Sequence, residues 1–262
     1  MEVRVSARRL EAYPLGRGGE LCGGRPRDVE GWGQVFDLWL VGSGGRIVDL
    51  WEDFGDSVVR RVTRPSEIVQ RAVERNTHLF LQFTEFGSRK ARDPFSKVLA
   101  VHIRRGDYEG HCVRLAKGNA SFYGWSQLPW PPDRFKIDVG ENGHEEGEYM
   151  KHCLPDVERI IGKIHATRDE WEKETVDLRA GHIDTLYILT NAHPEWVQDL
   201  KSRIYDKGRG WKVVTSHDLV FSDSQEKDVG MTIDMDLARR AAVFVGNGWS
   251  SLTSNVVHRR LT

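Results

Sequence analysis

The chain has 262 residues, enough to bury a substantial core, and its 39% hydrophobic and 29% charged residues are typical of a globular protein. Its 38 lysines and arginines almost balance its 39 aspartates and glutamates, which argues against a nucleic-acid partner and requires any basic site to be local. No apolar run approaches the ~20 residues of a membrane span, and the N-terminus lacks the apolar stretch of a signal peptide.

The first third of the chain gives weak structural signals. Residues 1–34 are rich in glycine and charge, which predicts loose structure. Two apolar segments around a Gly-Ser-Gly-Gly turn predict a hairpin at 35–50. A helix is expected to begin after Ser66 and to continue to Leu79. We assign residues 1–96 to a partial N-terminal segment.

From residue 97 onward, predicted strands and helices alternate. Buried strands are predicted at the apolar runs 98–103, 185–190, 211–215 and 242–245. Helices are predicted at 149–174, 194–205, 225–241 and from 250 onward. This alternation indicates parallel βαβ units, and so an α/β domain at 97–262 with a Rossmann-like open parallel sheet. Residues 108–146 lack periodicity, which is typical of an active-site loop or an insertion.

The cysteines and the end of the chain give few constraints. Cys22, Cys112 and Cys153 form neither a metal-binding pattern nor a disulfide framework, which leaves either one bridge with one cysteine over, or unpaired thiols. Asn119 begins a single N-glycosylation sequon, and such sequons occur by chance. Residues 258–262 read as the middle of a helix, so we expect a fragment of a longer protein.

The first candidate site follows the strand at 98–103. Ligands of open α/β sheets bind beyond the carboxyl ends of the strands. Alternation along the strand places His102 and Arg104 on one face. An arginine at a strand end, with Gly106 two residues later, can contact a ligand phosphate at two points. The alternative is a surface loop in which an arginine pairs with Asp107.

The second candidate site follows the last predicted strand. Residues 246–255 read as a glycine-bearing turn, two serines and a helix start. The free N–H groups of a helix start, with the hydroxyls of Ser250 and Ser251, can bind an anion. Gly246 and Gly248 would let a ligand approach the backbone closely. The alternative is a serine that only caps the helix.

The third candidate is Asp234, which lies between apolar residues and is therefore expected to be partly buried. A buried carboxylate needs hydrogen-bond donors, and the ring N–H and exocyclic amine of guanine are a matching pair. The alternative is an aspartate that caps a helix or forms a salt bridge. Thr190 and Asn191, which follow another strand, are weaker candidates for lining the same cleft.

These segments together resemble the GDP-fucose-using transferases, namely the protein O-fucosyltransferases and the α1,6-fucosyltransferases. The family's first motif, a strand followed by His-x-Arg-Arg-Gly-Asp, matches residues 101–107. Its later motif is an aspartate seven residues before an alanine that leads into Phe-Ile-Gly-Asn-x-x-Ser-Ser-Phe-Thr, and it matches Asp234 and residues 241–253. The resemblance covers roughly residues 97–255.

The resemblance implies roles for individual residues. Arg104 would be catalytic, binding the β-phosphate of the donor and stabilising the charge that grows there as the fucose–phosphate bond breaks. His102 and Asp234 would hold the guanosine.

The later motif implies further donor contacts. Ser250, Ser251 and the backbone of Leu252 would hold the diphosphate, and Asn247 belongs to the same donor-binding motif. Leu252 stands where many members have an aromatic residue.

The resemblance also implies a two-lobed GT-B enzyme that needs no metal or other cofactor and that acts in the secretory pathway. In agreement, no Asp-x-Asp pair stands at a predicted strand end, because Asp234 and Asp236 fall within a predicted helix. Residues 1–96 contain no equivalent of the family's glycine- and asparagine-bearing loop, and no catalytic base is recognisable there. This chain would therefore correspond to the C-terminal, donor-binding lobe with an incomplete N-terminal segment.

The predicted function is transfer of fucose from GDP-fucose to a hydroxyl of a protein or glycan acceptor, with inversion at the anomeric carbon. One alternative keeps the fold and changes the sugar, because the motifs contact the nucleotide and the phosphates. Another is a catalytically inactive module that binds a nucleotide sugar. The sequence does not identify the acceptor.

Overall fold

The computed structural model describes residues 3–6, 48, 51–58, 62–81, 93–118, 120–131, 135, 146–175 and 182–261. Cys22, Asn119 and almost all of the hairpin predicted at 35–50 lie outside the described residues.

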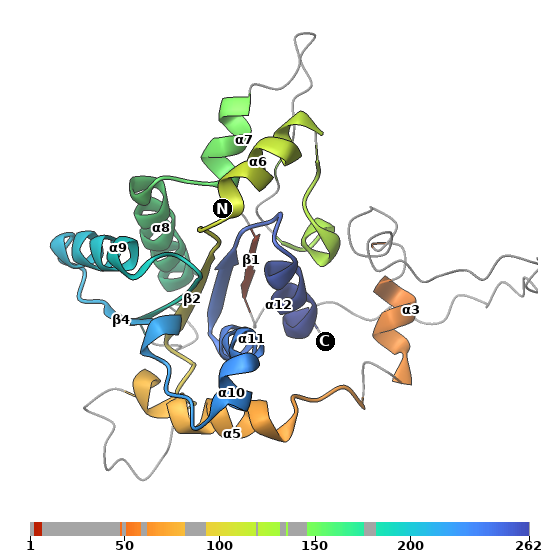
Figure 1. The fold of residues 1–262 in the computed structure, drawn as a ribbon, viewed down its shortest axis with the longest axis vertical. Coiled ribbons are helices and arrows are strands. Elements are labelled where there is room, and N and C mark those ends of the chain that lie inside the picture. The colour runs from red at the N-terminus through yellow and green to blue at the C-terminus, as the bar shows by residue number, and fades with distance from the viewer. Residues whose placement is uncertain are drawn as a thin grey trace, which may run out of the picture.

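The core of the fold is an open five-stranded sheet in the order β1-β5-β2-β3-β4 (Figure 1). Four strands run parallel: β2 (Val98–Ile103), β3 (Thr185–Thr190), β4 (Lys212–Thr215) and β5 (Val243–Gly246). β1 (Val3–Ser6) pairs antiparallel with β5 at the edge. The predicted α/β class and open parallel sheet are confirmed, whereas the prediction of loose structure at 1–34 missed β1.

Helices cover both faces of the sheet (Figure 1). α8 (Val157–Thr175) and α9 (Pro194–Asp206) pack on one face. α5 (Glu67–Asn76), α11 (Gly230–Arg240) and α12 (Ser251–Leu261) pack on the other. Both α5 and β1 come from residues 1–96, so part of that segment contributes to the same core.

The two faces of the sheet follow the alternation of side chains along each strand. Leu99 and Val101 of β2 belong to the cluster that contains the α8 and α9 side chains. Val98 and Ala100 belong to the cluster on the α11 side, together with Phe244 of β5. The β2 strand is buried along its whole length, which is why its sequence reads as a continuous apolar run.

A third group of elements, which we call the strand-end layer, lies beyond the end of the sheet at which β2 leads into α6 (Figure 1). It comprises α6 (Tyr108–Lys117), the 3-10 helix η4 (Gly124–Gln127) and α7 (Glu146–Cys153). The expectation that residues 108–146 lack regular structure is therefore wrong for α6. Its buried side chains are Tyr108, Cys112 and Ala116, which are spaced for a helix but are too weakly apolar to signal one.

Two predicted helices are each divided into two. The helix predicted at 149–174 is broken around Pro155, where α7 ends and α8 begins, because proline cannot continue the hydrogen bonding of a helix. The helix predicted at 225–241 is divided at Val229 into α10 (Ser224–Asp228) and α11. The remaining described elements are α3 (Trp51–Asp56), η2 (Thr77–Phe80) and η6 (Ser216–Asp218).

Candidate functional site

The turn that follows β2 contains two adjacent arginines, Arg104 and Arg105, and is fixed by Gly106 and Asn191. Gly106 has φ +61°, and a Cβ there would lie 3.0 Å from the amide nitrogen of Asn191, so glycine suits this turn on both counts. Asn191 joins the ends of β2 and β3, because its Oδ1 accepts a hydrogen bond of 2.8 Å from the backbone N–H of Arg105. This role of Asn191 is structural and differs from the cleft-lining role considered from sequence.

The two arginine side chains have different surroundings. Arg105 donates to the carbonyl of Pro155, and its guanidinium lies over the Trp196 ring at 4.7 Å from the centroid, so packing fixes it. The side chain of Arg104 is 36% exposed and pairs with Asp107 at 3.1 Å. Sequence reasoning left open a phosphate contact or this ion pair, and the structure contains the ion pair. Arg104 is nevertheless the arginine whose charge can reach a ligand in solution.

His102 links the end of β2 to the first turn of α12. It is 5% exposed, and its Nδ1 lies 2.9 Å from the hydroxyl of Thr253. Burial, and secondarily the nearby charge of Arg104, lower the pKa of His102 to about 3. His102 is therefore a neutral hydrogen-bonding group at physiological pH, one that can orient a ligand without adding charge.

The glycines between β5 and α12 are required by internal packing. A Cβ on Gly246 would lie 2.5 Å from the Thr253 hydroxyl, and a Cβ on Gly248 would lie 2.5 Å from the Phe122 ring. We had expected these glycines to admit a ligand close to the backbone. Protein side chains occupy that space instead, and the glycines allow α12 and the strand-end layer to approach the turn.

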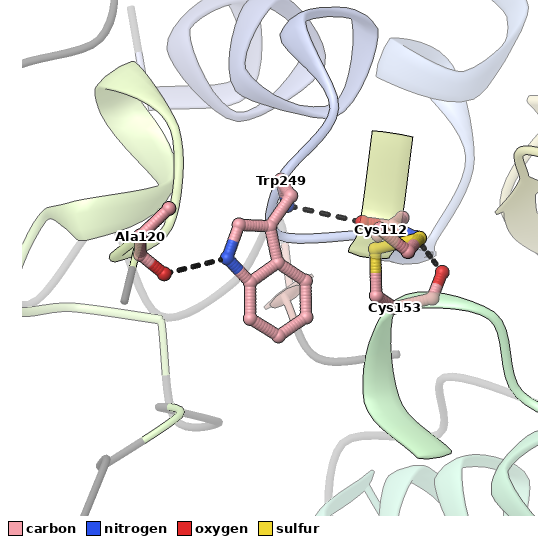
Figure 2. The surroundings of a disulfide bond; sticks show 5 residues. Cys112, Ala120, Cys153 and Trp249 are labelled. Atoms are coloured by element: carbon pink, nitrogen blue, oxygen red, sulfur yellow. Dashed lines mark hydrogen bonds between the residues drawn. A yellow bond between two sulfur atoms is a disulfide. The ribbon is translucent and has the colours of Figure 1, made fainter. Parts of the chain in front are cut away.

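The disulfide between Cys112 and Cys153 joins α6 to α7, which decides between the two alternatives left open by the sequence (Figure 2). The Trp249 indole lies between this disulfide and Ala120, and its N–H donates to the Ala120 carbonyl at 2.9 Å. Asn247 is buried, its side-chain amide donates to the Cys153 carbonyl at 2.7 Å, and its Oδ1 accepts from the backbone N–H of Trp249 at 3.0 Å. Asn247 thus holds the turn against the strand-end layer, whereas we had placed it at the donor.

The serine pair lies where the helix begins. Ser250 is buried and precedes α12, Ser251 is its exposed first residue, and Leu252 packs partly against the core. The first N–H groups of a helix have no partner within it, and they carry the positive end of the helix dipole. The start of α12 therefore has the polarity that a phosphate requires.

Asp234 lies on α11 above β3 and β4. Its carboxylate accepts hydrogen bonds from the Tyr187 hydroxyl and, at 2.9 Å, from the Ser216 hydroxyl. Burial raises the pKa of Asp234 to about 6, although both hydroxyls favour the ionised form. The neighbouring Asp236 is the salt-bridged aspartate, paired with Arg239 and with Arg240 at 2.8 Å each.

His102 and Asp234 lie on one side of the sheet. His102 follows Ala100 in the alternation of β2 and faces α12. Tyr187, which binds Asp234, belongs to the same face. The structure therefore places His102 against the first turn of α12 and Asp234 on the same face over the neighbouring strands. Arg104, two residues beyond His102, instead contacts Asp107 and the Tyr108 ring at the start of α6.

No protein-family model and no curated protein sequence matches the chain. The family resemblance accordingly remains a prediction. Among the described residues, no group of three or more His, Cys, Asp or Glu side chains is arranged to hold a metal ion. None of the helices in the described parts of the chain has the length and apolarity that a membrane span requires.

Sequence reasoning missed several residues that shape the site. Thr253 orients His102, and Tyr187 and Ser216 orient Asp234. Trp249 and the disulfide fix the turn that leads into α12. A tyrosine in the middle of a buried strand was the available signal for a polar partner, because a buried phenol usually finds one.

Proposed function

We propose that this chain binds the GDP part of GDP-fucose at the strand ends and transfers fucose to an acceptor hydroxyl, as the donor-binding lobe of a metal-independent, inverting GT-B enzyme. The observation that carries the proposal is the position of Arg104. Its side chain, which is 36% exposed, follows the parallel strand β2, two residues beyond the His102 that contacts α12.

Arg104 would exchange its present partner for phosphate. Its ion pair with Asp107 is solvent-exposed, since the Asp107 side chain is 78% exposed, and such pairs contribute about 0–1 kcal/mol. A diphosphate carries more charge and can accept two parallel hydrogen bonds from a guanidinium. When the fucose–phosphate bond breaks, negative charge accumulates on the β-phosphate, and Arg104 would stabilise it together with the N–H groups at the start of α12.

Asp234 would contribute the nucleotide specificity. With a pKa of about 6, its carboxyl is largely ionised at pH 7 and can accept the two adjacent donors of guanine. The Tyr187 and Ser216 hydroxyls each occupy one lone-pair direction, and a carboxylate has about four. These hydroxyls would fix the carboxylate in the orientation that guanine requires.

A non-catalytic nucleotide-sugar-binding module is the second candidate. The absence of a recognisable acceptor loop in residues 1–96 supports it, whereas the partly exposed Arg104 supports turnover. A transferase that uses another GDP-sugar is a third candidate, because the residues named above contact only the nucleotide and the phosphates.

The test combines binding and turnover. We expect GDP to raise the melting temperature of the protein, and we expect the protein to release GDP from GDP-fucose, slowly with water and faster with an acceptor hydroxyl. Arg104→Ala should lower GDP release at least about 100-fold, the effect of removing one fixed donor from a developing oxyanion. A melting temperature raised by GDP without any release of GDP from GDP-fucose would establish the binding module. Release of GDP from GDP-mannose but not from GDP-fucose would establish another donor.

Arg114→Ala is the matched control, because Arg114 is an exposed arginine on the adjacent α6. It should leave both GDP protection and GDP release unchanged. Unchanged release by the Arg104→Ala protein would remove Arg104 from the mechanism, and equal losses in the two variants would indicate a general effect of surface charge.

A further inference from the structure

A separate pocket of about 460 Å³ is lined by residues of α5, α11 and α12 and lies within the size range of small-molecule sites. It is bounded by the segment that enters α5 and by one side of each of the helices α11 and α12. Its lining residues on α11 and α12 recur three and four positions apart, as expected for one side of a helix. None of the donor-site residues proposed above lines it.

The pocket carries an excess of positive charge. Arg64, Arg239 and Arg259 line it together with a single carboxylate, that of Asp236. That carboxylate is buried and already pairs with Arg239 and Arg240. Within the described part of the chain, no carboxylate forms an ion pair with Arg64 or Arg259. Three guanidinium groups against one carboxylate leave two positive charges of the lining uncompensated.

The arginines are close enough to influence one another. Burial, followed by the positive charge of Arg239, lowers the pKa of Arg259, and the charge of Arg64 acts in the same direction while Asp236 opposes it. Like charges held together without a ligand are unfavourable. A bound anion would relieve this repulsion.

Apart from His258, the rest of the lining is apolar or weakly polar. Val69 of α5 is buried, Met235 packs partly against the core, and Pro65 adds a third apolar surface. Asn255 is an exposed residue at the α12 border. An ion without an apolar part would leave these surfaces unfilled, and a neutral apolar molecule would leave the arginines unpaired.

We infer that this pocket binds a phosphate monoester with an apolar body, at a site separate from the strand ends. A phosphate monoester carries a charge of about −1.5 to −2 at neutral pH, which matches the two uncompensated positive charges. Its oxygens accept two parallel hydrogen bonds from a guanidinium, and Arg259 and Arg64 supply such donors. The apolar body would lie against Val69 and Met235.

The test uses 1-naphthyl phosphate as the probe, with 1-naphthol and inorganic phosphate as its separate halves, and follows binding to the full chain by calorimetry. We expect the probe to bind at least tenfold more tightly than either half. Arg259→Ala should weaken probe binding about 10- to 100-fold, the equivalent of losing a hydrogen bond between charged groups. Arg259→Lys should give an intermediate loss of probe affinity, because lysine keeps the positive charge but cannot donate the two parallel hydrogen bonds of a guanidinium.

Asn255→Trp is a second variant that leaves every arginine in place. A large side chain at this exposed position should fill the pocket and abolish probe binding while the melting temperature changes little. Arg71→Ala is the matched control, because Arg71 is an exposed arginine of α5 that does not line the pocket. It should bind the probe as the unmodified protein does.

Probe binding should also be independent of the donor site. Arg104→Ala should leave probe affinity unchanged, and GDP should not displace the probe. Loss of probe binding in the Arg104→Ala protein, or displacement by GDP, would assign the probe to the strand ends and overturn the second site. Equal binding of 1-naphthol and the probe, or full affinity in both the Arg259→Ala and Asn255→Trp proteins, would overturn it as well.

Discussion

The sheet and the strand-end layer are held together by different interactions. The sheet is covered on both faces, and its clusters consist of close-packed apolar side chains from the strands and the helices. The strand-end layer is built from short helices around one disulfide and a group of aromatic rings, including Trp249 and Phe122 at 4.9 Å between centroids. Both regions bury apolar side chains, and the layer has in addition a covalent cross-link, the disulfide.

The cross-links of the layer meet at the turn before α12. The Tyr123 N–H donates to the Gly248 carbonyl at 2.8 Å, and the Trp125 N–H donates to the Ser254 hydroxyl at 2.9 Å. The bonds of Asn247 and Trp249 reach the same turn from α7 and from Ala120. The position of the candidate phosphate-binding helix start therefore depends on the layer, whereas Arg104 follows β2 of the sheet and pairs with Asp107 at the start of α6, so its position depends on both regions. Changes in the two regions should affect stability and ligand binding differently.

The largest expected effect comes from the sheet. Phe244 of β5 is fully buried, and Phe244→Ala should lower the free energy of unfolding by about 3–5 kcal/mol. Urea denaturation should show a lower midpoint with an unchanged slope, because sheet and layer unfold together. Val62→Ala is the control, since Val62 is 66% exposed and should change stability by less than about 0.5 kcal/mol. A second transition in the Phe244→Ala protein would mean that the layer folds independently of the sheet.

The next effect comes from the layer. Replacing both Cys112 and Cys153 by serine opens a link across 41 residues and should cost about 2–4 kcal/mol. Hydrogen exchange should accelerate in α6, η4 and α7 and at the turn before α12, while the amides of β2 and β3 stay protected. GDP affinity should fall as well. Reductant should have the same effect on the unmodified protein and no further effect at these residues in the double variant. An equal loss of hydrogen-exchange protection in the sheet and in the layer would contradict the view that the disulfide stabilises mainly the layer.

The regular part of the fold could be predicted because its signals are local. The strands at 98–103 and 185–190 are continuous apolar runs, and the structure places β2 and β3 at those residues. The pairing of Cys112 with Cys153 could not be derived, because it depends on how α6 lies against α7. The environment of Asp234 was likewise hidden, since Tyr187 precedes it by 47 residues and the two meet only across the sheet and α11.

The candidate site was predicted only in part, because some of its features follow from local sequence patterns and others depend on distant contacts. Alternation along β2 distinguishes Arg104 from Arg105, and the two side chains do have separate surroundings. The roles of Gly248 and Asn247 could not be read from the turn sequence, because both depend on strand-end-layer residues that are distant in sequence. Local patterns thus predicted the placement of side chains that follow the strands of the sheet. They did not predict the roles of residues whose contacts are with the strand-end layer.

The smallest expected effect lies at the contact between β2 and the first turn of α12 and depends on pH. His102 has a pKa of about 3 in the folded protein and 6.5 as its ordinary value, so the unfolded chain takes up a proton first as the pH falls. His102 should therefore lower the free energy of unfolding below pH 6.5, and its own contribution to this loss is roughly 2 kcal/mol at pH 5. His102→Gln keeps a polar group near Thr253 and should remove this loss in urea titrations at pH 7 and pH 5. An identical loss in the His102→Gln and unmodified proteins would show that His102 is not the group responsible.

Asp234 acts in the opposite direction, because its folded pKa of about 6 lies above its ordinary 3.8 and stability is gained as the pH falls between these values. Asp234→Asn removes this gain and should therefore steepen the loss of unfolding free energy between pH 7 and pH 5 in the same urea titrations.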